Sequence, residues 1–301
     1  MKKEFYKLFK TEELPSSIDN DEDRKLIKNE IYQRLQQSIG QQHSTKGKVF
    51  TLFATFRYQA AAVLVGICTL SLIAYIYQKQ HLNTEYITVQ APKGKVLEVF
   101  LPDQSKITLN AASTIKYPTK FIDTRDIYLE EGEAYFDVAH DESKPFIVHT
   151  GAIHTKVLGT AFNIKSYKAL PNITVTVARG KVQVNENSKN LDVLTIDKQL
   201  TFNKADHRAI TQNIKASSIV SWTHGDFNLN GVYFNEIMLA IANRFKVKMI
   251  YDAKVFRNCE NSIRFTHKQS LTDVLQVLKT IQPIKYTLKN DSVFISGKPC
   301  Q

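Results

Sequence analysis

Cysteine is scarce in this chain, with three residues in 301. Three cysteines cannot form the multiple cross-links of a disulfide framework, so that class of small secreted domain is excluded. Cys68 lies within an apolar run, which leaves Cys259 and Cys300 as the pair that an oxidising compartment could join. Because their separation in sequence does not show that their Cα atoms come close, we expect both thiols to remain free.

Clustered positive charge is also missing, although the formal net charge is +11. A nucleic-acid groove requires a stripe of Lys and Arg with aromatic side chains between them. Lysines instead occur singly between acidic or apolar neighbours, as at Lys106, Lys168 and Lys246. We therefore expect no direct contact with nucleic acid. The apolar content of 43% excludes a chain that is disordered throughout.

No spacing of side chains indicates a metal centre, a cofactor or an enzyme. His149 and His154 are five residues apart, which places them on opposite faces of one continuous strand, so we interpret them as separate surface or turn residues. Glu131 and Glu133 flank Gly132 without a base, nucleophile or pocket, which indicates turn residues at the start of a strand. We expect no cofactor and no enzymatic activity.

The sequence does contain one long segment without charge, residues 58–78, between Arg57 and Lys79. In a helix it would extend roughly 30 Å, the thickness of the hydrocarbon core of a bilayer. Tyrosines lie at both ends, as is typical of membrane interfaces. We predict one transmembrane helix over 58–78. A buried core helix is usually shorter, and a cleaved signal peptide would not begin so far along the chain.

Positive charge is more abundant before this segment than after it. Lys46, Lys48 and Arg57 precede the segment with no acid nearby, whereas Glu85 closely follows Lys79. Flanking positive charge favours the cytoplasmic side of a membrane. The sequence therefore predicts a cytoplasmic N-terminal tail, residues 1–57, and places the chain beyond about residue 80 outside that membrane.

The tail is too short to bury a core of its own. Residues 21, 22 and 23 are acidic, which favours the N-terminal end of a helix. From residue 27 onward every fourth residue is apolar, and together these two patterns predict a helix over 21–39. Either a partner protein accepts this stripe in a groove, which we favour, or the helix lies on the membrane surface. The stripe consists of Ile27, Ile31, Leu35 and Ile39, and a second cluster with helical spacing consists of Phe5, Leu8 and Phe9.

Over residues 89–205, short runs of β-branched and aromatic residues alternate with turn residues. This density of strands predicts a β-sandwich or β-roll domain. Alternating residues over 173–177 and 182–184, with Arg179 and Gly180 between them, predict a hairpin. The other expected strands cover 96–101, 107–109, 127–129, 134–138, 146–148 and 161–164.

After Trp222 helical periodicity returns, and residues 222–298 predict a small α+β domain of two βαβ-like units. Ser270 with Asp273 predicts a capping box at the start of the second helix, which Pro283 ends. The expected helices cover 234–245 and 271–278, and the expected strands cover 227–229, 247–251, 263–265, 284–288 and 293–295. The chain is thus mainly β with an α+β part, preceded by a helical tail and one membrane span.

Five motifs follow one another in the β region, and in this order they resemble the FecR-type anti-sigma regulators. They are LPDQS at 101–105, LNAAS at 109–113, EGEAYFDV at 131–138, KPFIV at 144–148 and VLGTAFNI at 157–164. Gln104 stands where the family has Gly, so the turn there must accept a side chain. The motif positions that we single out are Leu101, Pro102, Asp103, Gly132, Glu133, Pro145, Phe146, Gly159 and Thr160.

The resemblance implies a single-pass protein of the inner membrane with a periplasmic C-terminus. Its partners would be an extracytoplasmic-function sigma factor, bound by the tail, and an outer-membrane TonB-dependent transducer. Residues 222–298 are similar to the short N-terminal domain of secretins and such transducers, which engages partners through a strand edge. The short tail lacks a recognisable anti-sigma helical domain. The alternative is an envelope structural or interaction protein that is anchored by a single helix.

The resemblance also draws attention to the bond between Gly159 and Thr160, where some FecR-type regulators are thought to cleave their own chain. Thr160 Oγ would attack the carbonyl of Gly159, and water would hydrolyse the resulting ester. We favour the simpler interpretation, in which Gly159 provides a permissive backbone conformation and Thr160 packs within a strand.

Overall fold

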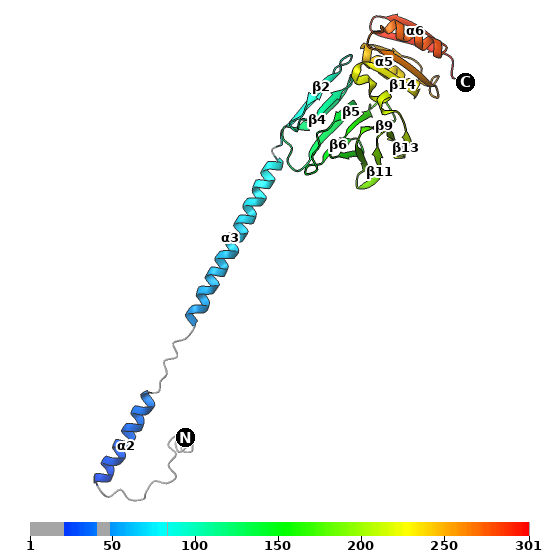
Figure 1. Cartoon of the computed structure of the whole chain (residues 1–301). Helices are drawn as coiled ribbons and strands as arrows, with labels where there is room; N and C mark the ends of the chain where they lie inside the picture. The colour runs from blue at the N-terminus through cyan, green and yellow to red at the C-terminus, as the bar shows by residue number, and fades with distance from the viewer. Residues whose placement is uncertain (1–20, 41–48, 83, 301) are drawn as a thin grey trace. The chain divides into compact units, whose positions relative to one another are not determined.

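The computed structural model describes residues 21–40, 49–82 and 84–300 (Figure 1). The chain divides into two units, Met1–Tyr77 and Gln78–Gln301.

In the first unit, helix α2 covers Asp21–Gly40 and confirms the predicted helix over 21–39. Ile27, Ile31 and Leu35 are exposed along it. Ile39 belongs to the same helix, but its side chain lies outside the described part of the chain, as do Phe5, Leu8 and Phe9.

Helix α3 covers Val49–Leu82 and includes the whole of the segment 58–78. Val63, Leu64 and Ile67 are among its exposed apolar side chains. Within the described residues, no helix combines the length and the hydrophobicity that crossing a bilayer requires.

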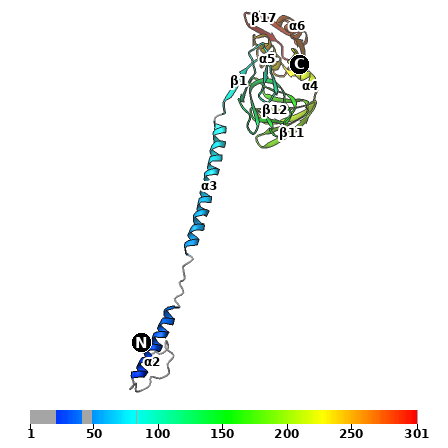
Figure 2. The same ribbon diagram turned by 60° about the vertical axis from the view of Figure 1, so that its left-hand side comes forward.

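The second unit begins with a two-layered β domain whose layers share the long strand β5, Arg125–Asp137 (Figures 1 and 2). The first half of β5 pairs with β4 and, in parallel, with β6; the second half pairs with β3 and β8. The first layer consists of β1 (Tyr86–Gln90), β4 (Thr114–Pro118), β5, β6 (Phe146–Thr150), β7 (Ile153–Val157), β10 (Lys181–Glu186) and β11 (Lys189–Thr195). The second layer consists of β2 (Leu97–Phe100), β3 (Lys106–Leu109), β5, β8 (Ala161–Ser166), β9 (Asn172–Arg179), β12 (Lys198–Asn203) and β13 (Ala209–Asn213). One hydrophobic core contains residues of both layers, which confirms the mainly β character of this region.

Gly132 lies where β5 passes from one layer to the other. Its φ of +105° lies in the left-handed region, and a Cβ at this position would come within 2.4 Å of Ser113. Only glycine fits such a bend without strain. The two strands predicted at 127–129 and 134–138 are therefore one strand, and the prediction that Glu131 and Glu133 are turn residues at a strand start is wrong.

The hairpin predicted over 173–184 is also wrong. Strand β9 pairs with β8 and β12, whereas β10 pairs with β7 and β11. Gly180, with a φ of +87°, connects β9 of one layer to β10 of the other. Alternation identified both strands and the turn, but it carries no information about which neighbours they pair with.

The turn at Gln104 adopts the backbone conformation that the resemblance indicated. Gln104 has a φ of +69°, in the region that glycine enters most readily. The amide of Leu101 donates to Ser105 O at 2.9 Å, and the amide of Gln104 donates to Leu101 O at 3.0 Å. The turn therefore accepts a side chain at a position with positive φ.

Strands and helices of an α+β region follow the β domain, after the short helices α4 (Ala216–Ile219) and η1 (Val220–His224). Strand β14 pairs with β16, while β18 pairs with β15 in parallel and with β17. The capping box at Ser270 and Asp273 is present at the start of α6. The elements are β14 (Asp226–Tyr233), α5 (Phe234–Phe245), β15 (Lys248–Ile250), β16 (Glu260–Thr266), α6 (Leu271–Ile281), β17 (Ile284–Lys289) and β18 (Ser292–Gly297).

Cys259 and Cys300 form a disulfide, so the expectation of two free thiols is wrong. Their Cα atoms are 5.3 Å apart, although 41 residues separate them in sequence. Cys259 immediately precedes β16, and Cys300 follows β18, the last strand. The folding of the domain brings these two positions together, which sequence separation alone could not reveal.

Candidate functional site

The motif residues of the β domain contribute to two buried polar networks. One network surrounds Arg125 and the other surrounds Glu133, which lie on the two halves of β5. Buried charges are costly unless they are paired and hydrogen-bonded, so the surroundings of each charge determine what it contributes.

Arg125 is 1% exposed and has an acceptor for each of its guanidinium N–H groups. Its Nε donates to Lys144 O at 2.8 Å, and one terminal nitrogen donates to Asp103 Oδ2 and Ala139 O, each at 2.8 Å. The other terminal nitrogen donates to the carbonyl oxygens of Asp141 and Leu158, each at 3.3 Å. All five donors of the guanidinium are thus satisfied within one domain.

These acceptors explain why several motifs occur together. Asp103 and Ser105 belong to LPDQS, and Ser105 Oγ donates to Asp103 Oδ2 at 2.6 Å. The KPFIV motif supplies the Lys144 carbonyl and also Phe146, whose ring centroid lies 5.4 Å from the Arg125 guanidinium carbon. VLGTAFNI supplies the Leu158 carbonyl. Three motifs that are distant in sequence therefore share one buried cation.

Glu133 is the centre of the second network and is 9% exposed. Its two carboxylate oxygens accept from Asn163 Nδ2 at 2.9 Å and from Asn110 Nδ2 at 2.8 Å. Burial raises the pKa of Glu133; Lys165 and the two amides oppose that shift without cancelling it. Ser113 Oγ accepts from the Glu133 amide at 2.9 Å. The LNAAS, EGEAYFDV and VLGTAFNI motifs therefore meet here.

The Glu133 network continues into the C-terminal domain. Asn163 Oδ1 accepts from the indole nitrogen of Trp222 at 3.2 Å, and Lys165 forms an ion pair with Glu236 on α5. Burial lowers the pKa of Lys165, but Glu236 and Glu133 raise it more, so its net shift is upward. Glu133 thus lies beneath the junction of the two domains.

Two further features connect the domains beside this network. The amide of Gly94 donates to the carbonyl of Asn243 on α5 at 2.7 Å. A cavity of about 200 Å³, lined partly by Asn110 and Trp222, opens beside the same junction. The junction therefore includes the Asn110 side chain that also binds Glu133.

Gly159 and Thr160 are held by close packing. A Cβ on Gly159 would approach His140 Cα to 2.6 Å, so no larger residue fits there without movement. Thr160 is 2% exposed, and its hydroxyl donates to Lys181 O at 2.9 Å. This arrangement agrees with a packing role. Cleavage of the bond between the two residues stays a prediction.

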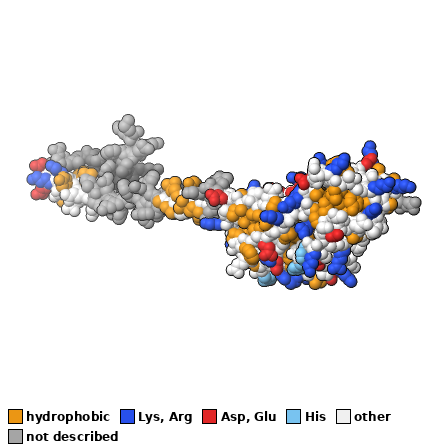
Figure 3. All heavy atoms as spheres, turned by 90° about the horizontal axis from the view of Figure 1, so that it is seen from above, with side chains coloured by type: hydrophobic (Ala, Val, Ile, Leu, Met, Phe, Trp, Pro, Cys, Tyr) orange, Lys and Arg blue, Asp and Glu red, His pale blue; other side chains and the backbone are white. Residues whose placement is uncertain are grey.

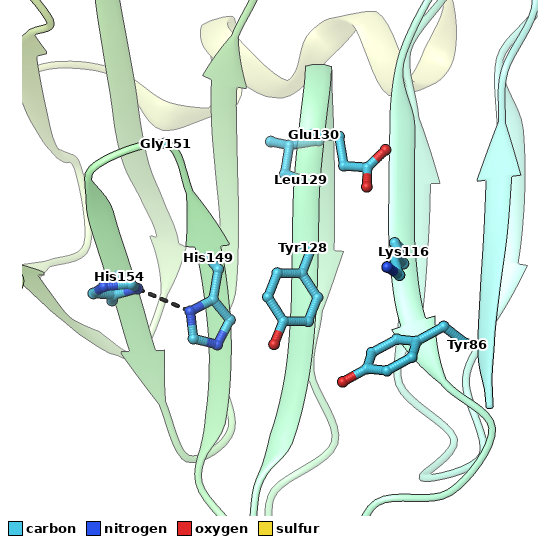
Figure 4. A pocket seen from close by; sticks show the side chains of 8 residues that line it. All are labelled: Tyr86, Lys116, Tyr128, Leu129, Glu130, His149, Gly151 and His154. Atoms are coloured by element: carbon cyan, nitrogen blue, oxygen red, sulfur yellow. Dashed lines mark hydrogen bonds between the residues drawn. The ribbon is translucent and has the colours of Figure 1, made fainter. Parts of the chain in front are cut away.

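His149 and His154 do not lie on opposite faces. Strands β6 and β7 form a hairpin in which the two residues are directly paired, and their Nδ1 atoms are 2.9 Å apart (Figure 4). The prediction of separate histidines failed because it assumed one continuous strand. Among the residues that the structure describes, no group of three or more His, Cys, Asp or Glu is arranged to hold a metal ion.

Sequence reasoning did not identify Arg125, Asn163 or Trp222 as members of these networks. Arg125 begins an alternating strand, where a charged residue normally faces water, and its partners are mostly backbone carbonyls. Asn163 lies within VLGTAFNI, so its place in a motif was a signal that could have marked it. Trp222 offered one clue, since it is the single tryptophan of the chain.

Two family models match the chain: "FecR protein" over residues 87–183 and "FecR, C-terminal" over residues 226–295. No curated protein is significantly similar to it. Two crystal structures of a proposed anti-sigma factor from Parabacteroides distasonis ATCC 8503 are similar, each with 27% sequence identity. One has a TM-score of 0.67 and covers 71% of this chain and 100% of that chain; the other has a TM-score of 0.66 and covers 70% and 99%. The two networks and the domain order thus occur in a chain that belongs to the FecR family.

Proposed function

We propose that this chain is a membrane-anchored anti-sigma factor. In this proposal the tail binds an extracytoplasmic-function sigma factor, and the C-terminal domain receives a signal from an outer-membrane TonB-dependent transducer. The observation that carries the proposal is the succession of a FecR domain and a FecR C-terminal domain after a helical tail with an exposed apolar stripe. The similarity to structures of a proposed anti-sigma factor supports the same function.

Helix α2 provides a surface suited to a protein partner. The side chains of Ile27, Ile31 and Leu35 recur at intervals of four residues, and they are 41%, 50% and 49% exposed. An apolar stripe of this kind binds in a hydrophobic groove of a partner, where burial of each large side chain contributes about 1.5–3 kcal/mol before the costs of association.

Two observations support a location across the inner membrane. The segment 58–78 contains no charged residue, and apolar side chains of α3 are exposed along it. The disulfide between Cys259 and Cys300 suits an oxidising compartment such as the periplasm rather than the cytoplasm. Together they favour an arrangement with the tail inside the cell and the second unit outside.

The C-terminal domain offers a route to a partner strand. Strands β14 and β16 form a two-stranded sheet in the described part of the chain. A strand at the edge of a sheet has backbone groups that can pair with an additional strand. This geometry supports recognition of a segment from a transducer.

The proposal is tested by co-purification of the full-length chain with each extracytoplasmic-function sigma factor of the source cell. We expect selective capture of one sigma factor, abolished by Ile31→Asp and retained by the matched variant Gln33→Asp, which places the same charge on another exposed side of α2. Equal capture by both variants would show that the stripe is not the contact. Capture of no sigma factor by the wild type would favour an envelope-binding role.

A further inference from the structure

The outward face of the first layer of the β domain contains a group of imidazoles, a carboxylate and tyrosines that the motifs do not explain. Val148 and Ile153 are fully buried, so their neighbours His149 and His154 face away from the core. These histidines, with Tyr128 and Tyr86, line a cavity of about 570 Å³ (Figure 4). Hydrophobic, basic, acidic and histidine side chains are intermixed on the face of the molecule that Figure 3 presents. The group is thus open to small solutes.

The protonation of this group follows from its hydrogen bonds. Asp126 Oδ1 lies 2.6 Å from His149 Nε2. Thr124 Oγ donates to the other oxygen of the same carboxylate, Asp126 Oδ2. A carboxylate only accepts, so His149 Nε2 carries a hydrogen and, in the neutral ring, His149 Nδ1 has a free lone pair.

The Nδ1 atom of His154 lies beside the Nδ1 atom of His149. The two Nδ1 atoms are 2.9 Å apart, so in the absence of a ligand His154 Nδ1–H donates to the lone pair of His149 Nδ1. A neutral imidazole moves its hydrogen to Nε2 without a net loss of charge, and both Nδ1 lone pairs then face one another.

We propose that His149 and His154 chelate one transition-metal ion of the copper, zinc and nickel class through their Nδ1 atoms. Imidazole nitrogen suits these metals, whereas calcium and magnesium require oxygen ligands. A small widening of the gap between the Nδ1 atoms accommodates metal–nitrogen bonds of about 2.0–2.1 Å. Water fills the remaining positions, because these two side chains provide only two ligands.

The surroundings of the His149 ring are those that metal-binding histidines typically have. A carboxylate on the second ring nitrogen fixes the orientation and raises the basicity of the ligand, and Asp126 occupies this place beside His149. Tyr128 stacks on the His149 ring, with centroids 4.6 Å apart and planes 15° apart. Lys116 lies over the Tyr86 ring, on the other side of Tyr128 from the histidines (Figure 4).

The test is titration of copper(II) chloride into the full-length chain in detergent, after a chelator has removed bound metal, with calorimetry and electron paramagnetic resonance. The chain has eight histidines, so variants assign the site. We expect wild type to bind one ordered equivalent with two nitrogen ligands, and His149→Gln and His154→Gln each to lose it. His207→Gln, at an exposed histidine paired with Glu186, serves as the matched control and should retain it.

Asp126→Asn keeps both ligands and should weaken binding by about 10- to 100-fold. Equal unfolding temperatures of all variants in the presence of chelator would show that each one folds. Unchanged copper stoichiometry in folded His154→Gln, or the absence of an ordered equivalent in the wild type, would overturn the proposal. Neither outcome depends on capture of a sigma factor.

Discussion

The two buried charges on β5 differ in where their partners come from. Arg125 obtains all its acceptors from the β domain, and most of them are backbone carbonyls. Glu133 is bound by two asparagine amides, and one of these asparagines also accepts from Trp222 in the segment that leads to the C-terminal domain. Arg125 therefore stabilises one domain by itself, whereas the environment of Glu133 depends on how two domains are joined.

Removal of the Arg125 charge should cause the largest loss of stability, because all of its partners belong to the β domain. Arg125→Met removes the charged partner of the Asp103 carboxylate and one donor from each of four carbonyls, and breaking a buried pair in this way costs about 3–5 kcal/mol. Urea unfolding measures the loss. The control is Arg179→Met, which breaks an exposed ion pair with Asp137 and should cost at most about 1 kcal/mol. Similar losses in both variants would contradict the role of Arg125.

Gly132→Ala tests the bend that separates the two networks. The variant combines an unfavourable positive φ, worth about 1–3 kcal/mol, with a contact of 2.4 Å or less between the new Cβ and Ser113. The matched control is Gly231→Ala, which also has a positive φ but whose new Cβ would have no neighbouring atom within 4 Å. Thermal unfolding should show a clearly larger loss for Gly132→Ala. Equal losses would mean that the contact with Ser113 relaxes without cost.

The pH dependence of stability should distinguish Glu133 from exposed acids. Because burial raises its pKa above the ordinary value of 4.5, the folded state holds a proton more tightly than the unfolded state. Wild type should therefore lose stability as pH rises from about 4.5 through the folded-state pKa, by about 1.4 kcal/mol for each pH unit that separates the pKa values of the folded and unfolded states. Glu133→Gln removes this titration, so its stability relative to wild type should increase over that interval.

Unfolding free energies measured at several pH values between 4 and 8 provide the comparison. The control is Glu98→Gln, whose side chain is 53% exposed and lies beside Lys106. A constant difference between Glu133→Gln and wild type across this range would contradict the raised pKa.

The smallest expected effect concerns the bond that crosses the domain boundary. Trp222→Phe removes the indole donor to Asn163 while leaving most of the ring in place, which should cost about 0.5–1.5 kcal/mol. Because Asn163 also binds Glu133, the double variant with Glu133→Gln should be less destabilised than the sum of the single variants. Strict additivity would show that the two contacts are independent.

Local patterns predicted the elements well in both domains. Alternation located most of the central strands of the β domain, and the apolar spacing of Phe234, Ile237 and Met238 located α5. The capping box at Ser270 could be predicted because Ser270 and its partner Asp273 are three residues apart in sequence. Each of these signals depends on neighbours within one turn or one strand.

Contacts between residues that are distant in sequence could not be predicted from local patterns. The hairpin at Gly180, the disulfide at Cys259 and the facing of His149 and His154 each depend on which strands become neighbours. The role of Arg125 could not be predicted for the same reason. Its acceptors are mostly backbone carbonyls, which every residue has, so no residue type in the sequence indicates them. The motifs correctly marked the region of both networks, but they did not reveal the charge at the centre of the first.

The position of Trp222 has a practical consequence. It is the single tryptophan of the chain, it is 3% exposed, and its indole N–H binds Asn163 at the boundary between the two domains. The tryptophan fluorescence of the protein, excited at wavelengths where its 13 tyrosines do not absorb, therefore originates at this boundary without any attached label. A ligand or partner that separates the domains would admit water to the indole and shift its emission to longer wavelength, so such a separation can be followed by the fluorescence of one residue.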